Sequence, residues 1–112
     1  MRKGIVLAIL GCSLLGGCAT FHGVPEQSRA KGFLANDAVR NLRYVTGCRG
    51  IEITSVVHRS SSEDVQIQQP GSYLVAGTLV EDWTVAGCGR EQAYRLIMQG
   101  TPGGHLFSIG KL

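Results

Sequence analysis

The amino-acid sequence predicts a small α+β domain in which one N-terminal amphipathic helix packs on an antiparallel sheet of about four strands. Its 112 residues leave room for a single domain. Apolar residues first recur at helical spacing over residues 34–45. From residue 51 onward they alternate with polar residues or gather in β-branched and aromatic runs, which is typical of strands. Turns that contain glycine or proline separate these runs, so we expect antiparallel neighbours.

The predicted helix carries a stripe of apolar residues: Leu34, Ala38, Val39, Leu42 and Val45. Spacings of three and four residues place such side chains on one face of a helix. The side chain of Asn36 or Asp37 can cap the start, and Gly47 can end the helix in a left-handed conformation. We therefore expect an amphipathic helix of about two to four turns.

The first predicted strand follows the helix directly. Ile51, Ile53 and Val57 alternate with polar residues, among them His58. This alternation indicates a half-buried strand, on which His58 faces solvent or a strand end without a ligand role. Residues 59–69 include three successive serines and are predicted to form a solvated loop.

The strongest strand signal covers residues 73–86, which are rich in Val, Leu, Thr, Tyr and Trp. Gly77 within it indicates a bulge, a bend or a break into two strands. The alternation places three large apolar residues on one face: Leu79, Trp83 and Val85.

Two adjacent acidic residues, Glu81 and Asp82, lie in the middle of this strand. They resemble a pair of catalytic carboxylates, but neighbouring strand residues point to opposite faces of a sheet and cannot flank one bond. We expect both carboxylates to keep an exposed face or edge soluble.

The rest of the chain predicts two further strands. Residues 87–89 form a glycine-rich turn, residues 93–98 a strand, and residues 101–104 a tight turn with proline at its first central position. Residues 106–109 form the closing strand. Like Trp83, Tyr94 is predicted to be a core residue and not a ligand platform.

The N-terminus has the pattern of an export signal. Arg2 and Lys3 are followed by an apolar run over residues 4–15, which is shorter than a membrane-spanning helix requires. The stretch Leu15-Gly16-Gly17-Cys18 resembles the lipobox of bacterial lipoproteins. The resemblance implies cleavage before Cys18 and attachment of lipid to its thiol. Ala19, in place of an aspartate, implies the outer membrane.

These features divide the chain into three parts. Residues 1–17 are a lipoprotein signal peptide, residues 18–32 a lipidated tether, and residues 33–112 a single domain in the periplasm, with the cell surface as an open alternative. Several acyl chains would hold the domain to the membrane far more firmly than one chain can.

Export also bears on Cys48 and Cys88, the two cysteines that remain in the domain. In an oxidising compartment a small domain is commonly stabilised by a disulfide, which is the pairing we expect. The closed loop of about forty residues corresponds to roughly 4 kcal/mol of chain entropy. The alternatives are a reactive thiol and a metal site. No metal is expected, because His22, His58 and His105 lie far apart and neither cysteine is in a CxxC pattern.

The C-terminal half also carries a family resemblance. Residues 77–90 contain Trp83, Val85, Cys88 and Gly89 in a W-x-V-x-x-C-G pattern, and a Gly-Gly-x-x-Phe-Ser ending follows at residues 103–108. This combination resembles small uncharacterised lipoproteins of Gram-negative bacteria, although His105-Leu106 departs from the small polar residue expected there. The resemblance implies the fold and the location, and no activity.

Charge and motifs exclude several classes of function. Loss of Arg2 and Lys3 would reduce 11 basic residues to nine against eight acidic ones, and the remaining arginines do not cluster, so nucleic acid is not expected as a partner. The sequence contains no catalytic motif such as GxSxG or HExxH, nor a serine with an indicative histidine and acid. An enzyme would need a free Cys48 or Cys88 beside His58 or His105. We expect no enzymatic activity and no cofactor.

The leading hypothesis is an interaction or structural module that is anchored to the membrane and docks to an envelope protein. It predicts an exposed sheet face or edge with apolar residues such as Val80 and Leu106. The alternative is a binder of a small ligand, or an inhibitor of an extracellular enzyme, with a concave pocket near Tyr73, Trp83 or Tyr94.

Overall fold

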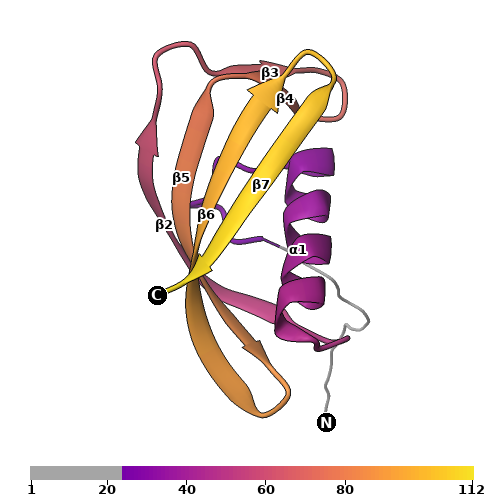
Figure 1. The fold of residues 1–112 in the computed structure, drawn as a ribbon, viewed down its shortest axis with the longest axis vertical. Helices are drawn as coiled ribbons and strands as arrows, with labels where there is room; N and C mark the ends of the chain where they lie inside the picture. The colour runs from indigo at the N-terminus through magenta and orange to yellow at the C-terminus, as the bar shows by residue number, and fades with distance from the viewer. Residues whose placement is uncertain (1–23) are drawn as a thin grey trace, which may run out of the picture.

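The computed structural model describes residues 24–112 (Figure 1). The predicted signal peptide, Cys18 and the first part of the predicted tether lie outside the described residues. In the described part, helix α1 (Gly32–Thr46) precedes six strands. These are β2 (Glu52–Ser61), β3 (Gln66–Gln68), β4 (Tyr73–Ala76), β5 (Thr78–Gly87), β6 (Arg90–Thr101) and β7 (Gly104–Lys111).

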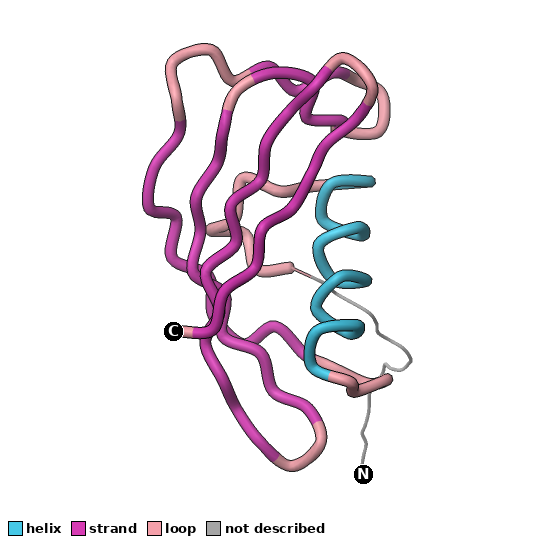
Figure 2. The backbone as a smooth tube through the Cα atoms, in the orientation of Figure 1, coloured by secondary structure: helices cyan, strands magenta, loops and turns pink. Residues whose placement is uncertain are grey.

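The main sheet has four antiparallel strands in the order β2-β5-β6-β7. Figure 2 shows α1 lying along one side of this sheet. The predicted α+β class, with one helix and a sheet of about four strands, is confirmed. Both longer hairpins have short turns, since Gly87 pairs with Arg90 and Thr101 with Gly104.

A second, two-stranded sheet pairs β3 with β4 and lies at the upper end of the molecule in Figure 1. The predicted loop over residues 59–69 is therefore wrong in part, because β2 continues to Ser61 and β3 falls within that range. The pattern was too weak to reveal β3, in which only Ile67 is partly buried between two exposed glutamines.

Two glycines allow the chain to reach this second sheet. Gly77 has a positive φ of 85° and separates β4 from β5, as the predicted break requires. Gly100 on β6 lies so close to the backbone of Ala76 that a Cβ atom there would collide with it. The absence of side chains at these two positions lets β4 cross over β6.

The start of α1 differs from the prediction. The helix begins at Gly32, and the residue before it, Lys31, makes no capping hydrogen bond with its side chain. Neither Asn36 nor Asp37 caps the helix. The backbone N–H of Phe33 instead donates to the Gly71 carbonyl (2.8 Å), so a distant loop satisfies the first turn.

The end of α1 agrees with the prediction. Gly47 has a left-handed φ of 72° and its N–H donates to the Arg43 carbonyl (3.0 Å). The predicted disulfide follows at once, since Cys48 is bonded to Cys88 in the turn between β5 and β6. The bond ties the end of the helix to the far end of the sheet.

The core lies between α1 and the inner face of the main sheet. Trp83 and Tyr94 both belong to it, which confirms their predicted role. The helix contributes its apolar stripe except Val45, which is 49% exposed. The sheet contributes the large side chains that alternate toward the helix. The core from both elements includes Leu34, Ala38, Leu42, Leu79, Val85, Leu96 and Met98. Burial of each Leu, Val or Met side chain among them contributes about 1.5–3 kcal/mol, and the smaller Ala38 contributes less.

The packed domain starts earlier than residue 33. Ser28 and Ala30 are buried, at 2% and 0% exposure, although both fall in the predicted tether. The residues just before α1 therefore belong to the domain, where they cover part of the inner face of the sheet.

Candidate functional site

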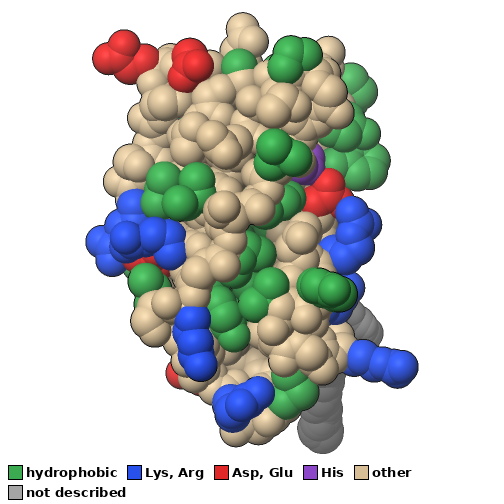
Figure 3. Space-filling model, in the orientation of Figure 1, with side chains coloured by type: hydrophobic (Ala, Val, Ile, Leu, Met, Phe, Trp, Pro, Cys, Tyr) green, Lys and Arg blue, Asp and Glu red, His purple; other side chains and the backbone are tan. Residues whose placement is uncertain are grey.

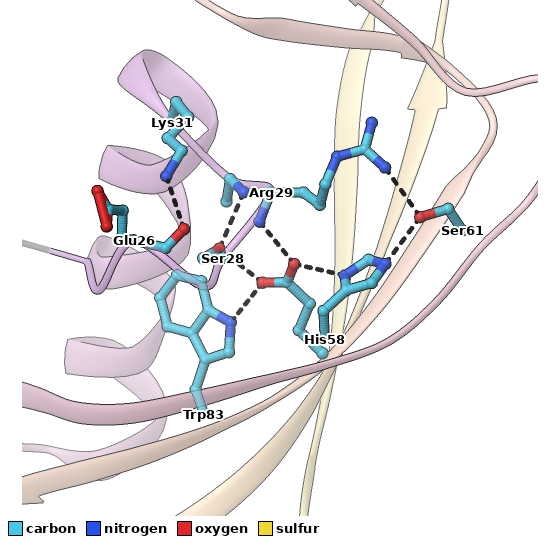
Figure 4. A network of polar contacts seen from close by, with 9 residues as sticks. Glu26, Ser28, Arg29, Lys31, His58, Ser61 and Trp83 are labelled. Atoms are coloured by element: carbon cyan, nitrogen blue, oxygen red, sulfur yellow. Dashed lines mark hydrogen bonds and ion pairs between the residues drawn. The ribbon is translucent and has the colours of Figure 1, made fainter.

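A buried carboxylate, Glu81, is the centre of a polar network whose donors Ser28, Arg29, His58 and Trp83 are labelled in Figure 4. It lies on the inner face of β5, under the segment that precedes α1. Four groups donate hydrogen bonds to its two oxygens: the Ser28 hydroxyl (2.6 Å), the Arg29 backbone N–H (2.8 Å), the Trp83 indole N–H (2.9 Å) and His58 Nδ1 (2.8 Å). The prediction that Glu81 keeps an exposed face soluble is wrong, because the N-terminal segment covers it.

These hydrogen bonds decide the charge of Glu81. Burial raises the pKa of this carboxyl group, but the donors from Ser28, Arg29, Trp83 and His58 together outweigh it and hold the pKa below its ordinary value. Glu81 is therefore a carboxylate at neutral pH, and an ionised carboxylate only accepts hydrogen bonds.

His58 extends the network toward the surface. Its side chain is partly buried; Nδ1 contacts Glu81, and Nε2 lies 2.8 Å from the Ser61 hydroxyl. The Arg29 guanidinium also donates to this hydroxyl (3.1 Å). The interpretation of His58 as a surface histidine without a role is wrong with respect to its contacts, as Figure 4 shows.

The sequence signal for this cluster is faint. His58 and Ser61 are three residues apart on β2, and only the register of β2 against β5 places His58 directly opposite Glu81. A strand irregularity between His58 and Ser60 then lets both His58 and Ser61 project from the inner side. Neither the pairing nor the irregularity is visible in the sequence.

Asp82 points to the opposite face of the sheet, as the alternation predicted. Its carboxylate is held by Arg95, through Nε (2.8 Å) and Nη2 (3.0 Å), and by Arg59 through Nε (2.7 Å). The hydrogen bond from Arg95 is the main cause that lowers the pKa of Asp82 to about 2, with Arg59 adding to it. The prediction that Asp82 keeps an exposed face soluble is wrong in part, because Asp82 lies on the outer face but is only 7% exposed and is paired with the two arginines.

The outer face of the sheet also bears apolar side chains that α1 does not cover. Val57 pairs with Asp82, Val80 pairs with Ile97, and Leu106 lies one strand further. Val57 is 45% exposed and Leu106 60% exposed. Figure 3 shows hydrophobic side chains over the middle of the visible face and Lys or Arg side chains toward its edges. We call Val57, Val80, Ile97 and Leu106 the outer-face patch.

An aromatic group lies near the start of α1. The rings of Phe33 and Tyr73 stack at 5.0 Å, Tyr73 and His105 follow at 6.4 Å, and Phe107 meets His105 edge-on at 5.4 Å. His105 Nε2 lies 2.7 Å from the Asp37 carboxylate. The structure thus places His105 far from His58, and the two contribute to separate clusters.

A cavity of about 410 Å³ opens beside the disulfide, between the end of α1 and the strands β5 to β7. Its lining combines the buried Val85 and Tyr94 with the exposed cations Arg90 and Lys111. Of the three aromatic residues at which the sequence predicted a pocket, Tyr94 lines this one.

The remaining chemistry of the domain is limited. Cys48 and Cys88 are bonded to each other, so neither is a free thiol. Across residues 24–112, no group of three or more His, Cys, Asp or Glu side chains is arranged so that it could bind a metal ion. In that same part of the chain, no helix has the length and hydrophobicity needed to cross a bilayer.

Comparisons with known proteins found no matching family model, no similar curated protein and no similar solved structure.

Proposed function

We propose that the chain is a lipoprotein of the outer membrane, held by lipid on Cys18, whose domain docks to another envelope protein through the outer-face patch. The observation that carries this proposal is the exposed apolar surface of the main sheet, opposite the face that α1 covers. The cysteine pair agrees with an oxidising compartment, where such bonds persist.

The charges of this face suit an interface. Asp82 is already neutralised by Arg59 and Arg95, so a partner that covers it buries no unpaired carboxylate. Exposed arginine beside apolar side chains is also a composition that protein interfaces favour. A partner would gain contact area from Leu106 and Val57 and hydrogen bonds from the two guanidinium groups.

The test is a pull-down from cross-linked native envelopes. We expect a defined envelope protein to copurify with the wild type and to fade with Cys18→Ala, which removes the anchor. It should also fade with Leu106→Ser, which removes the most exposed member of the patch. Tyr44→Ser is the matched control, because Tyr44 is 88% exposed but lies on α1. Equal recovery with Leu106→Ser would contradict docking through this face.

The cavity beside the disulfide favours a second candidate, the binding of a small ligand. Its volume lies within the range of ligand pockets. The cations Arg90 and Lys111 outnumber the one carboxylate of the lining, Glu91, and this excess of positive charge near Val85 and Tyr94 favours a small anion with an apolar part. A fatty-acid titration followed by NMR tests it: shifts confined to the cavity residues, and lost in Arg90→Ala, would support binding. Unchanged spectra would exclude this ligand class.

A further inference from the structure

Ser61, His58 and Glu81 form a chain of three side chains linked by two hydrogen bonds of equal length. Ser61 Oγ lies 2.8 Å from His58 Nε2, and His58 Nδ1 lies 2.8 Å from Glu81 Oε2. Because the Glu81 carboxylate can only accept, the proton of a neutral His58 lies on Nδ1. Nε2 then presents its lone pair to the Ser61 hydroxyl, which is the tautomer that a general base needs.

Structural need accounts for only part of this arrangement. Ser28, the Arg29 backbone and Trp83 already supply three donors to Glu81, and two of these donors are buried groups that the fold must satisfy. Ser61 is exposed at the end of β2, so water could satisfy its hydroxyl as well as His58 does. Its alignment with the imidazole is the property of a nucleophile paired with a base.

The Arg29 side chain adds a cation at the same oxygen. Its Nη1 lies 3.1 Å from Ser61 Oγ, while its backbone N–H holds Glu81. If Ser61 Oγ bonded to a carbonyl carbon, the carbonyl oxygen would become negatively charged within reach of this guanidinium. A positioned donor of this kind stabilises an oxyanion.

We propose that Ser61, His58 and Glu81 form a serine-nucleophile site that hydrolyses carboxylic esters, with Arg29 as the donor to the oxyanion. Ser61 is the nucleophile, His58 the general acid and base, and Glu81 a positioning residue that holds the imidazole. Because Ser61 and Arg29 are exposed, the site suits an ester presented on an accessible surface. The proposal goes beyond the docking function and does not depend on it.

The reaction balances with water as the only co-reactant. Ser61 Oγ bonds to the ester carbonyl carbon while its proton passes to His58 Nε2. The bond from that carbon to the leaving oxygen breaks, and His58 returns the proton to give the free alcohol. A water oxygen then bonds to the carbonyl carbon of the acyl-serine while one of its protons passes to His58 Nε2. The bond from that carbon to Ser61 Oγ breaks, which releases the carboxylic acid, and His58 returns the proton to Ser61 Oγ.

The test uses the full chain in detergent with a biotin-tagged fluorophosphonate and peptide mass spectrometry, together with hydrolysis of p-nitrophenyl acetate. We expect the probe on Ser61 and its loss in Ser61→Ala. His58→Gln should lower both labelling and hydrolysis about 100-fold, because glutamine is no base. Arg29→Ala should lower hydrolysis by less than the roughly 100-fold typical of a buried oxyanion donor, because the Arg29 side chain is exposed.

Ser60→Ala is the matched control, since Ser60 is the adjacent serine and pairs with Val80 on the outer face. It should label and hydrolyse like the wild type. Thermal melts followed by circular dichroism check that the variants fold. The position of the label in the wild type identifies the nucleophile even if a variant does not fold. Labelling spread over several serines, or equal labelling of Ser61 in a folded His58→Gln variant, would overturn the proposal and leave the three residues a structural network.

Discussion

Glu81 and Asp82 are adjacent on one strand, yet they lie in opposite surroundings. Glu81 faces inward and is held by Ser28, Trp83, His58 and a backbone N–H. Asp82 faces outward and is held by two arginines that are each about half exposed. The inner carboxylate organises buried donors that have no other partner, while the outer one neutralises cations that water can also solvate. The same charge therefore has a structural role on one face and a surface role on the other.

Glu81→Ala should give the largest loss of stability, about 3 kcal/mol. The substitution leaves the Ser28 hydroxyl and the Trp83 indole N–H buried without an acceptor. Urea unfolding followed by circular dichroism measures the loss. Glu81→Gln is the control, because it keeps the shape and one acceptor oxygen, and it should lose less.

Asp82→Ala should cost about 1 kcal/mol or less. Arg59 and Arg95 would turn to solvent, which satisfies their guanidinium groups. The same urea experiment applies. A loss as large as that of Glu81→Ala would contradict the contrast between the two faces.

Because its pKa is lowered, Asp82 should make the stability of the fold depend on pH in the acid range. A carboxylate whose pKa is lower in the folded state contributes stability that is complete above the unfolded pKa and is lost as pH falls through the folded value. For Asp82 the loss should run from its ordinary pKa of 3.8 down to about 2 and should not exceed the effect of Asp82→Ala.

The pH experiment compares urea midpoints of the wild type and Asp82→Asn across this range. Asn does not titrate, so the difference between the two curves isolates Asp82. The pKa of Glu81 is lowered too, so its contribution should fall in the same direction below its ordinary pKa of 4.5 and should remain in the Asp82→Asn curve. Parallel curves would contradict the stated role of Asp82.

Salt should have the smallest effect, a fraction of 1 kcal/mol. Raising the concentration of sodium chloride screens the half-exposed arginine pairs of Asp82 more than the buried bonds of Glu81. The loss caused by Asp82→Ala should therefore shrink at high salt, while the loss caused by Glu81→Ala should stay constant. Equal salt sensitivity of the two losses would show that their surroundings do not differ as described.

Glu81 and Asp82 also show which features of the structure can be predicted from the sequence. Alternation along the strand places them on opposite faces, and the apolar pattern predicts Trp83 in the core, which the structure confirms. Burial of Glu81 could not be predicted, because its cover is the segment around Ser28, which has no regular apolar period. The disulfide could be predicted from the number of cysteines, because Cys48 and Cys88 are the only two in the predicted domain.

The cluster of His58 and Ser61 could not be predicted from the sequence, for a related reason. Residues three positions apart on a regular strand point to opposite faces of the sheet. His58 and Ser61 point to the same face only because of the irregularity between His58 and Ser60. The start of α1 shows the same limit: Gly71, a loop residue distant in sequence, supplies the acceptor that a capping side chain was expected to supply. Tertiary contacts determine these details, and periodicity does not encode them.

Photo-cross-linking in intact cells can detect docking of the outer face to an envelope protein. A benzophenone amino acid replaces Leu106 in one variant and Tyr44 in another, both in the otherwise native chain. Docking through the outer face predicts a discrete adduct from position 106, none from position 44, and loss of the adduct when Cys18 is also changed to alanine. The same adducts from both positions, or no adduct from position 106, would contradict it.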